Sequence, residues 1–209
     1  MMVTIRNSVL RCVFCAAFAV MFGSIPTIAS GEVNPQEEFV LADFNSGKAP
    51  NNAGDNFGAW SREFNDETQF TDMTFVSDDA KGDIGGHAIR LDYDVDSPTQ
   101  AYNGFWMTLG KDDFTSYSIL NLYVKGDKKA GFTKKVKIEF KDSNNRPSAA
   151  YFMVTKITDQ WQKISVPFDR FQGKNDWKNL RQFVIVFDDV DSQPKVGSVL
   201  IDQISITKI

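Results

Sequence analysis

Cysteine is nearly absent from this chain of 209 residues: only Cys12 and Cys15 occur. Both lie in an apolar stretch near the N-terminus, where their CxxC spacing lacks the folded context that a redox or zinc motif needs. The rest of the chain is free of cysteine. Core packing, with or without a metal, must therefore hold it together in place of disulfides.

Histidine is also scarce, and His87 is the only one. No second histidine, GxSxG elbow or HxxxH pattern accompanies it, which argues against a Ser-His-Asp centre or a histidine-ligated metal. Two-carboxylate chemistry needs only a pair of acids, such as Asp188 and Asp189. A small hydrolase or lyase therefore stays open, but a domain of this size has little room for a deep cleft. A non-catalytic protein is favoured.

Long hydrophobic runs are missing except for one near the N-terminus. Residues 1–30 carry Arg6 and Arg11, no acidic residue, an apolar run from Cys12 to Phe22 and small residues up to Ser30. This arrangement is typical of a secretory signal peptide, and the run is shorter than the roughly 20 residues of a membrane-spanning helix. We expect export to a periplasm or to the outside of the cell, with no membrane span after cleavage. A retained N-terminal anchor is the alternative.

The chain also lacks a dense basic cluster. Its formal net charge is −4, and the loss of the two arginines in residues 1–30 lowers this to −6. Because phosphate binding depends on Lys and Arg, nucleic acid is not expected as a partner. Cleavage after Ser30 leaves 179 of the 209 residues, which is enough for one domain with a sizeable core.

Helical periodicity is absent from the remaining sequence. After a short polar tether at 31–38, brief β-rich runs alternate with clusters of Gly, Asn, Asp, Ser and Pro. Their number and spacing predict one all-β domain at 39–209, a two-sheet jelly-roll sandwich. The predicted strands are Phe39–Phe44, Thr68–Ser77, His87–Tyr93, Gly104–Leu109, Ser118–Lys125, Lys135–Lys141, Ala149–Thr155, Gln160–Pro167, Gln182–Asp188 and Val199–Thr207.

Period-two alternation separates a core face from an outer face in four of these strands. If the four strands share a sheet, its outer face carries three aromatic side chains among polar ones. Flat rings offer a platform to the CH faces of sugars, and polar neighbours can bond hydroxyl groups. This pattern predicts a site for an oligo- or polysaccharide; packing of the rings beneath a loop is the alternative. The predicted site residues are Trp106, Tyr123, Tyr151, Asn121, Lys137, Glu139 and Arg146.

Asp202 falls in phase with Leu200, Ile204 and Ile206 in the last strand, and we expect that phase to face the core. A carboxylate there is costly unless it is paired or ligates a metal. Asp43, Asn45 and the turn around Asn56 could supply further oxygens, so the pattern predicts a structural calcium that clamps the two ends of the domain. A bulge that turns Asp202 outward, or a loop that it caps, is the alternative.

Three short segments resemble a known superfamily. They are Val40-Leu41-Ala42-Asp43-Phe44-Asn45, WQKISVPFDRF at 161–171 and VLIDQISI at 199–206. They resemble the galactose-binding-like β-sandwich superfamily, and within it the chain is most similar to family 11-type carbohydrate-binding modules. The Gly-Asp pair after Lys125 and the segment from Trp161 are also similar to complex I intermediate-associated protein 30-type domains.

The resemblance implies a jelly roll, a calcium near the termini with Asp43 and Asp202 at matching positions, and a sugar cleft lined by aromatics. With the outer-face pattern it predicts an exported, non-catalytic carbohydrate-binding-module-like protein. The alternative is a periplasmic interaction or assembly factor that uses the same fold for a protein partner.

Overall fold

The computed structural model describes residues 37–63, 65–77, 86–142, 150–173 and 176–208. The predicted signal peptide, most of the predicted tether, and Arg146 lie outside the described residues. Within them no helix is long and apolar enough to cross a membrane. The elements are β1 (Glu38–Ala42), β2 (Phe57–Ser61), β3 (Phe70–Val76), β4 (Ala88–Asp94), β5 (Tyr102–Thr108), β6 (Ile119–Gly126), β7 (Lys135–Asp142), β8 (Ala150–Thr155), β9 (Gln162–Pro167), the 3-10 turn η1 (Phe168–Arg170), β10 (Leu180–Asp188) and β11 (Val196–Thr207).

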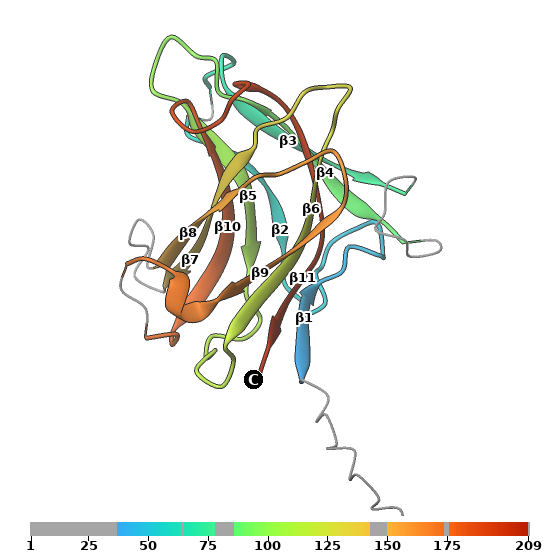
Figure 1. Cartoon of the computed structure of the whole chain (residues 1–209), viewed down its shortest axis with the longest axis vertical. Coiled ribbons are helices and arrows are strands. Elements are labelled where there is room, and N and C mark those ends of the chain that lie inside the picture. Colours follow the sequence, from blue (N-terminus) through green and yellow to red (C-terminus); the bar gives the residue numbers. More distant parts are fainter. Residues whose placement is uncertain (1–36, 64, 78–85, 143–149, 174–175, 209) are drawn as a thin grey trace, which may run out of the picture. The chain divides into compact units, whose positions relative to one another are not determined.

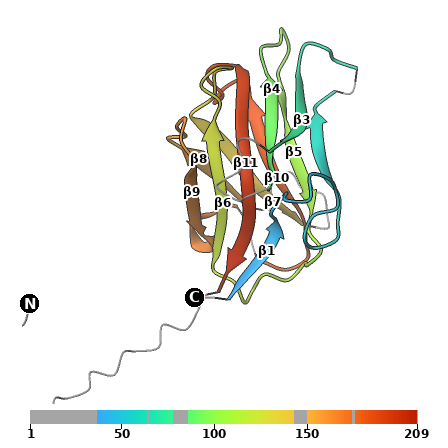
Figure 2. The same ribbon diagram turned by 90° about the vertical axis from the view of Figure 1, so that its right-hand side faces the viewer.

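The strands form two antiparallel sheets that face each other (Figure 1). Sheet A has the order β3-β4-β11-β6-β9, with β1 paired to the end of β11, as Figure 2 shows. Sheet B has the order β2-β5-β10-β7-β8. From β5 onward the chain crosses repeatedly between the sheets, so neighbours in sequence are often in different layers. The predicted all-β, two-sheet sandwich is confirmed.

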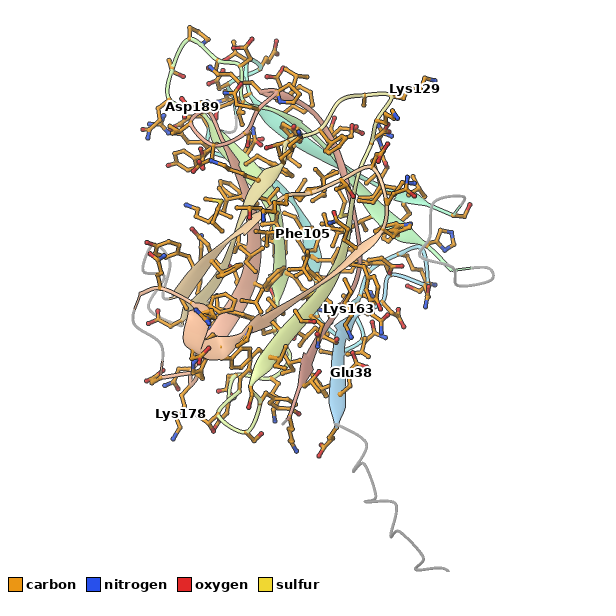
Figure 3. The ribbon with its side chains drawn as sticks, viewed as in Figure 1. Glu38, Phe105, Lys129, Lys163, Lys178 and Asp189 are labelled. Atoms are coloured by element: carbon orange, nitrogen blue, oxygen red, sulfur yellow. The ribbon has the colours of Figure 1, made fainter. Side chains whose placement is uncertain are left out.

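The core lies between the sheets and is built by the predicted alternation. Phe105 on β5 is fully buried there, and Figure 3 shows it in the middle of the sandwich. Leu122 on β6, Ile138 on β7 and Phe183 on β10 are likewise fully buried. Truncating such a phenylalanine to alanine typically costs about 3–5 kcal/mol. Most of the phenylalanines that the structure describes are buried in this core or packed against it.

Gly104 lets β5 and β10 lie close together in the middle of sheet B. A Cβ atom at this position would stand 1.9 Å from the carbonyl oxygen of Ile185 on β10. No side chain fits in that space without moving the neighbouring strand. The glycine also places no side chain on the outer face of sheet B at this point.

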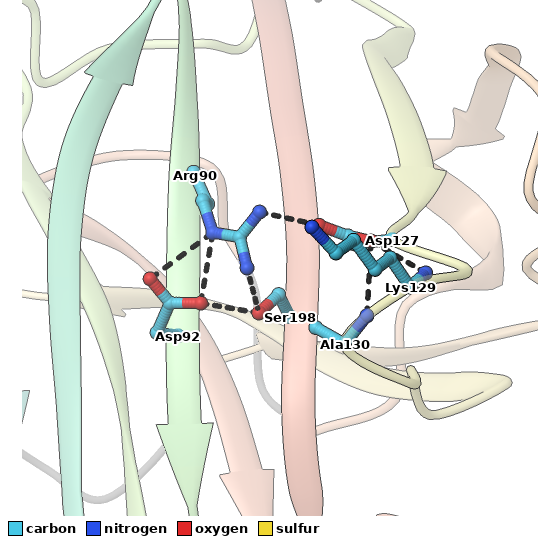
Figure 4. Close-up of polar contacts among 6 residues, drawn as sticks. All are labelled: Arg90, Asp92, Asp127, Lys129, Ala130 and Ser198. Carbon is cyan, nitrogen blue, oxygen red and sulfur yellow. Dashed lines mark hydrogen bonds and ion pairs between the residues drawn. The ribbon is translucent and has the colours of Figure 1, made fainter.

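An ionic network ties the outer face of sheet A together (Figure 4). The guanidinium of Arg90 on β4 donates through Nε to Asp92, 2.9 Å away, and through Nη2 to Ser198 on β11, 2.8 Å away. Its Nη1 donates to Asp127, which follows β6. The network thus joins two strands and a loop that are far apart in the sequence.

The same contacts set the charge state of Asp127. Partial burial pushes the pKa of this carboxyl up, but the backbone N–H groups of Ala130 and Lys129 and the Arg90 guanidinium outweigh burial. The pKa of Asp127 therefore lies below its ordinary value of 3.8. The carboxylate is held in its charged, bonded form at neutral pH.

Candidate functional site

The outer face of sheet B is hollowed into a groove. The strand register aligns Trp106 on β5, Val184 on β10 and Glu139 on β7 in one row across the sheet. A second row aligns Trp60 on β2, Gly104 on β5, Val186 on β10 and Lys137 on β7. We call this surface the sheet B groove; it is lined by Trp60, Tyr102, Trp106, Lys137, Glu139, Lys141, Gln182, Val184, Val186, Asp188, Asp189 and Asp191.

One wall of the groove is aromatic. The Trp60 and Tyr102 rings have centroids 5.9 Å apart at an interplanar angle of 59°. The Trp106 indole lies against Gly58: a Cβ at position 58 would stand 3.4 Å from Trp106 Nε1. All three rings keep part of their surface exposed. They form a half-buried apolar wall of the kind that small-molecule sites use.

Trp60 is held by packing and not by a hydrogen bond. Its Nε1 is buried and has no hydrogen-bond partner among the described residues. Lys141 Nζ lies 5.9 Å from the centroid of the Trp60 ring. Because Trp60 is on β2 and Lys141 on β7, this cation–π contact reaches across the groove over β5 and β10.

The opposite wall, on β7, is charged. Lys137 Nζ lies 3.0 Å from Glu139 Oε1, and Lys141 Nζ lies 3.9 Å from Glu139 Oε2. The Glu139 side chain is only 7% exposed, so this carboxylate is largely desolvated between two ammonium groups. The wall offers both donors and an acceptor to a polar ligand.

The groove consists of two hollows that share residues. One, of about 290 Å³, is lined by Trp60, Trp106, Lys141, Gln182 and Val184. The other, of about 430 Å³, shares Trp60 and Lys141 and extends to Tyr102 and the loop at 188–191. Four alternate residues of β10, from Gln182 to Asp188, line the floor of the groove. At about 3.4 Å per residue, this stretch of β10 is about 20 Å long. That length suits a chain of several sugar units better than a single small molecule.

Tyr102 is fixed by the loops behind it. Its backbone N–H donates to Oε1 of Gln69, a side chain that is only 1% exposed. Arg62 donates to the Gln100 carbonyl oxygen and lies over the Tyr102 ring, 5.3 Å from its centroid. Asp189, at the end of the sandwich opposite Glu38 in Figure 3, accepts from the Ala101 N–H at 3.2 Å. The end of the groove is thus preorganised.

The structure divides the predicted site residues between the two sheets. Trp106, Tyr151, Lys137 and Glu139 share the outer face of sheet B. The idea that their strands share a sheet with the strand at 118–125 is wrong, because β6 pairs with β9 and β11 in sheet A. Tyr123 and Asn121 are therefore on the outer side of sheet A, away from the groove.

Asn121 and Tyr151 are both held by side-chain hydrogen bonds. Asn121 is only 5% exposed; its Nδ2 donates to Thr207 Oγ1, and its Oδ1 accepts from Ser165 Oγ, each at 2.7 Å. The Tyr151 hydroxyl donates to Gln172 Oε1 at 2.7 Å. Tyr151 lies three strands from Trp106, about 14 Å at about 4.8 Å per strand, so it flanks the groove at a distance.

Several groove residues were not among the predicted site residues. Trp60 was missed because its five-residue strand, β2, was not predicted, although Phe57 and Ala59 alternate there with Gly58 and Trp60. Tyr102 lies just before the predicted start of β5. Lys141 can be predicted as a site residue from the sequence, because it continues the outward phase of Lys137 and Glu139.

The predicted metal residues lie at the end of β1. Pairing of Ala42 with Ile204 brings Asp43, the next residue, beside the Asp202–Gln203 segment. Asp43 accepts from the Asn45 N–H at 3.0 Å and from Asn52 Nδ2 at 2.8 Å. The side-chain oxygen of Asn45 instead accepts from the His87 N–H at 3.3 Å.

Asp202 is fully buried, but the predicted phase is wrong. A bulge between Asp202 and Ser205, with Gln203 at φ 40°, shifts the alternation by one residue. Ile201 and Ile204 face the core, and Asp202 points to the other side of sheet A. Within the described residues, no group of three or more His, Cys, Asp or Glu side chains could hold a metal. The strand register places Asp43, one residue after the pair of Ala42 and Ile204, near the segment that carries this buried carboxylate, and carboxylate, amide and backbone oxygens are the ligands that a hard cation takes.

Known structures share this fold. The family 11 carbohydrate-binding module of the cellulosomal cellulase Lic26A-Cel5E of Clostridium thermocellum is 18% identical, with a TM-score of 0.58 over 83% of this chain and 95% of that one. A family 11 module from Clostridium thermocellum, solved with a β-1,3-1,4-mixed-linked tetrasaccharide, is 19% identical, with a TM-score of 0.57 over 81% and 94%. An apo cyclase from Fischerella sp. is 10% identical, with a TM-score of 0.52 over 81% and 96%. At these identities the likeness shows the fold alone.

The two antiparallel sheets therefore define a class by fold, the two-sheet β-sandwich domains. No curated protein matches the sequence. The carbohydrate binding domain 30 family matches residues 50–208, which is most of the chain. The chain belongs to this family.

Proposed function

We propose that this protein is an exported, non-catalytic carbohydrate-binding protein that takes a linear glycan along the sheet B groove. The observation that carries the proposal is the groove of two adjoining hollows, with an aromatic wall on β2 and β5 and a charged wall on β7. Sugar rings would stack their CH faces on Trp60 and Trp106 and direct hydroxyl groups to Lys137 and Glu139. Membership of a carbohydrate-binding family supports this assignment.

A β-linked glucan is the first ligand to test. The Clostridium thermocellum module was solved with a mixed-linked tetrasaccharide on the same fold. The groove of this chain, about 20 Å long by strand geometry, has the length for an oligosaccharide of that size or larger. We propose export from the N-terminal pattern of residues 1–30, which leads to a periplasmic or extracellular location.

We also propose a structural calcium at the end of β1. Asp43 and Asp202 would hold it together with backbone oxygens, because Asn45 turns its side-chain oxygen to His87. When bound, the ion would neutralise the buried Asp202 carboxylate and fix the first strand of the domain to the last.

Native affinity electrophoresis through gels containing mixed-linked β-glucan, xylan or mannan tests the function. Each stacked ring contributes about 0.5–1.5 kcal/mol beyond its buried area, so we expect Trp60→Ala with Trp106→Ala to weaken binding by about 5- to 150-fold. Trp161→Ala, a tryptophan beside edge strand β9 of sheet A, is the matched control and should bind as the wild type. Equal retention of both variants would place binding elsewhere.

A further inference from the structure

The two hollows of the sheet B groove differ in charge. The hollow lined by Trp60, Trp106, Lys141, Gln182 and Val184 contains an ammonium and an amide but no carboxylate among the described residues. The other hollow is lined by four carboxylates, those of Glu139, Asp188, Asp189 and Asp191, which outnumber its two ammonium groups, Lys137 and Lys141. A bound chain would therefore meet a donor-rich end and an acidic end.

Among the ion pairs that the described residues form on the charged wall, that of Lys141 is the longest. The distance from Lys141 to Glu139 is 3.9 Å, and the same carboxylate lies closer, at 3.0 Å, to Lys137. One carboxylate thus serves two ammonium groups. Farther along the strand, Lys135 has its own partner in Asp191 at 3.4 Å. A net positive charge remains on the partly buried Lys141 side chain, which is 28% exposed.

Lys141 also covers the platform that a sugar ring would need. Its ammonium rests over the Trp60 ring, and both side chains line both hollows. A sugar that stacks on Trp60 must displace the ammonium from the ring. The displaced cation then needs a new partner, and a carboxylate on the ligand supplies a stronger one than a hydroxyl does.

We propose that Lys141 selects glycans that carry a carboxylate: a uronate unit, or a neutral backbone unit with an acidic substituent, binds in the hollow at Trp60, Trp106 and Lys141. This inference rests on the proposed function and names the ligand class for that groove. The second hollow keeps an excess of negative charge, four carboxylates against two ammonium groups, and repels a further anion, so the matching ligand is a largely neutral chain with sparse acidic units. A continuous polyuronate is disfavoured.

Two polysaccharides, each in three charge states, test this inference. Mixed-linked β-glucan and xylan would be compared with carboxylate-bearing forms of each: C6-oxidised glucan at sparse and complete oxidation, and xylan with sparse or dense glucuronate. The measurement is the ratio of affinities within one protein variant, by affinity electrophoresis or calorimetry. We expect the sparse acidic form to bind about tenfold more tightly than the neutral form, and the fully acidic form to bind more weakly than the sparse one.

Lys141→Gln removes the charge while keeping a hydrogen-bond donor, on a shorter side chain, and should bring the acidic-to-neutral ratio to about one. Lys163→Gln, an exposed lysine on β9 of sheet A (Figure 3), should keep the wild-type ratio. Equal affinity for neutral and sparse acidic chains, or a preference that survives Lys141→Gln, overturns the inference and leaves the proposed function standing. Failure to bind any chain in any charge state overturns both.

Discussion

Substitution of Asn121 tests whether this residue has a structural role or a ligand-binding role. Its amide bridges three strands of sheet A, since it donates to Thr207 on β11 and accepts from Ser165 on β9. Asn121→Ala removes two hydrogen bonds worth about 0.5–1.5 kcal/mol each and leaves the buried Thr207 hydroxyl without this partner. We expect a loss of about 3 kcal/mol in the free energy of unfolding. At about 2–4 °C per kcal/mol for a domain of this size, the melting temperature should fall by about 6–12 °C.

The assay pairs thermal and urea unfolding with glycan affinity measured below the melting transition. Ser165→Ala is the graded control: it removes one of the two bonds at an exposed side chain, so it should cost about 1 kcal/mol. Glycan affinity should be unchanged in both variants, because β6 and β9 are in sheet A. An Asn121→Ala variant that melts like the wild type but loses glycan affinity would refute this reasoning and restore Asn121 as a ligand contact.

Other perturbations test other parts of the structure. The pKa of Asp127 is lowered in the folded state, so its stabilising effect is present above its ordinary pKa of 3.8 and is lost as the pH falls through the folded pKa. Asp127→Asn should therefore lose less stability than the wild type on acidification. Urea unfolding from pH 6 to about pH 2 measures this difference. Gly104→Ala should cost about 1–3 kcal/mol or more in urea unfolding because its Cβ meets the Ile185 carbonyl, and a change below about 0.5 kcal/mol would contradict that clash. Addition of a chelator should lower the melting temperature of the wild type but not that of Asp202→Asn, and identical curves with calcium and with chelator would remove the proposed ion.

The faces of the strands could be predicted from the sequence because a period of two is a local property. Leu122, Ile138 and Phe105 are buried, as the alternation predicts, since each strand needs only its own residues to define its two sides. Which sheet a strand joins depends instead on pairing with distant strands. Alternation therefore predicted that Tyr123 points outward but could not tell that β6 belongs to the other layer.

The remaining errors, in contrast, have local causes. A bulge adds one residue at Gln203, so Asp202 points to the side of sheet A opposite to that of Ile204. The residue types there do not predict this bulge. Trp60 belongs to an edge strand of five residues with a glycine inside, which is too short to give a clear period. The candidate site was found in part, through Trp106, Lys137 and Glu139, because those residues are on well-patterned central strands.

The pairing of β1 with β11 has a mechanical consequence. The first and last strands of the sandwich run antiparallel, with Glu38 opposite Thr207, and an ion pair of 2.7 Å joins Glu37 to Lys208. A force that pulls these two ends apart loads the strand pair one residue at a time, as a zipper opens, and not all its hydrogen bonds together. The domain should therefore yield to tension first by peeling β1 from sheet A. The groove, on sheet B, shares no strand with that pair, so a stretched molecule can lose its first strand while the five strands of sheet B stay together.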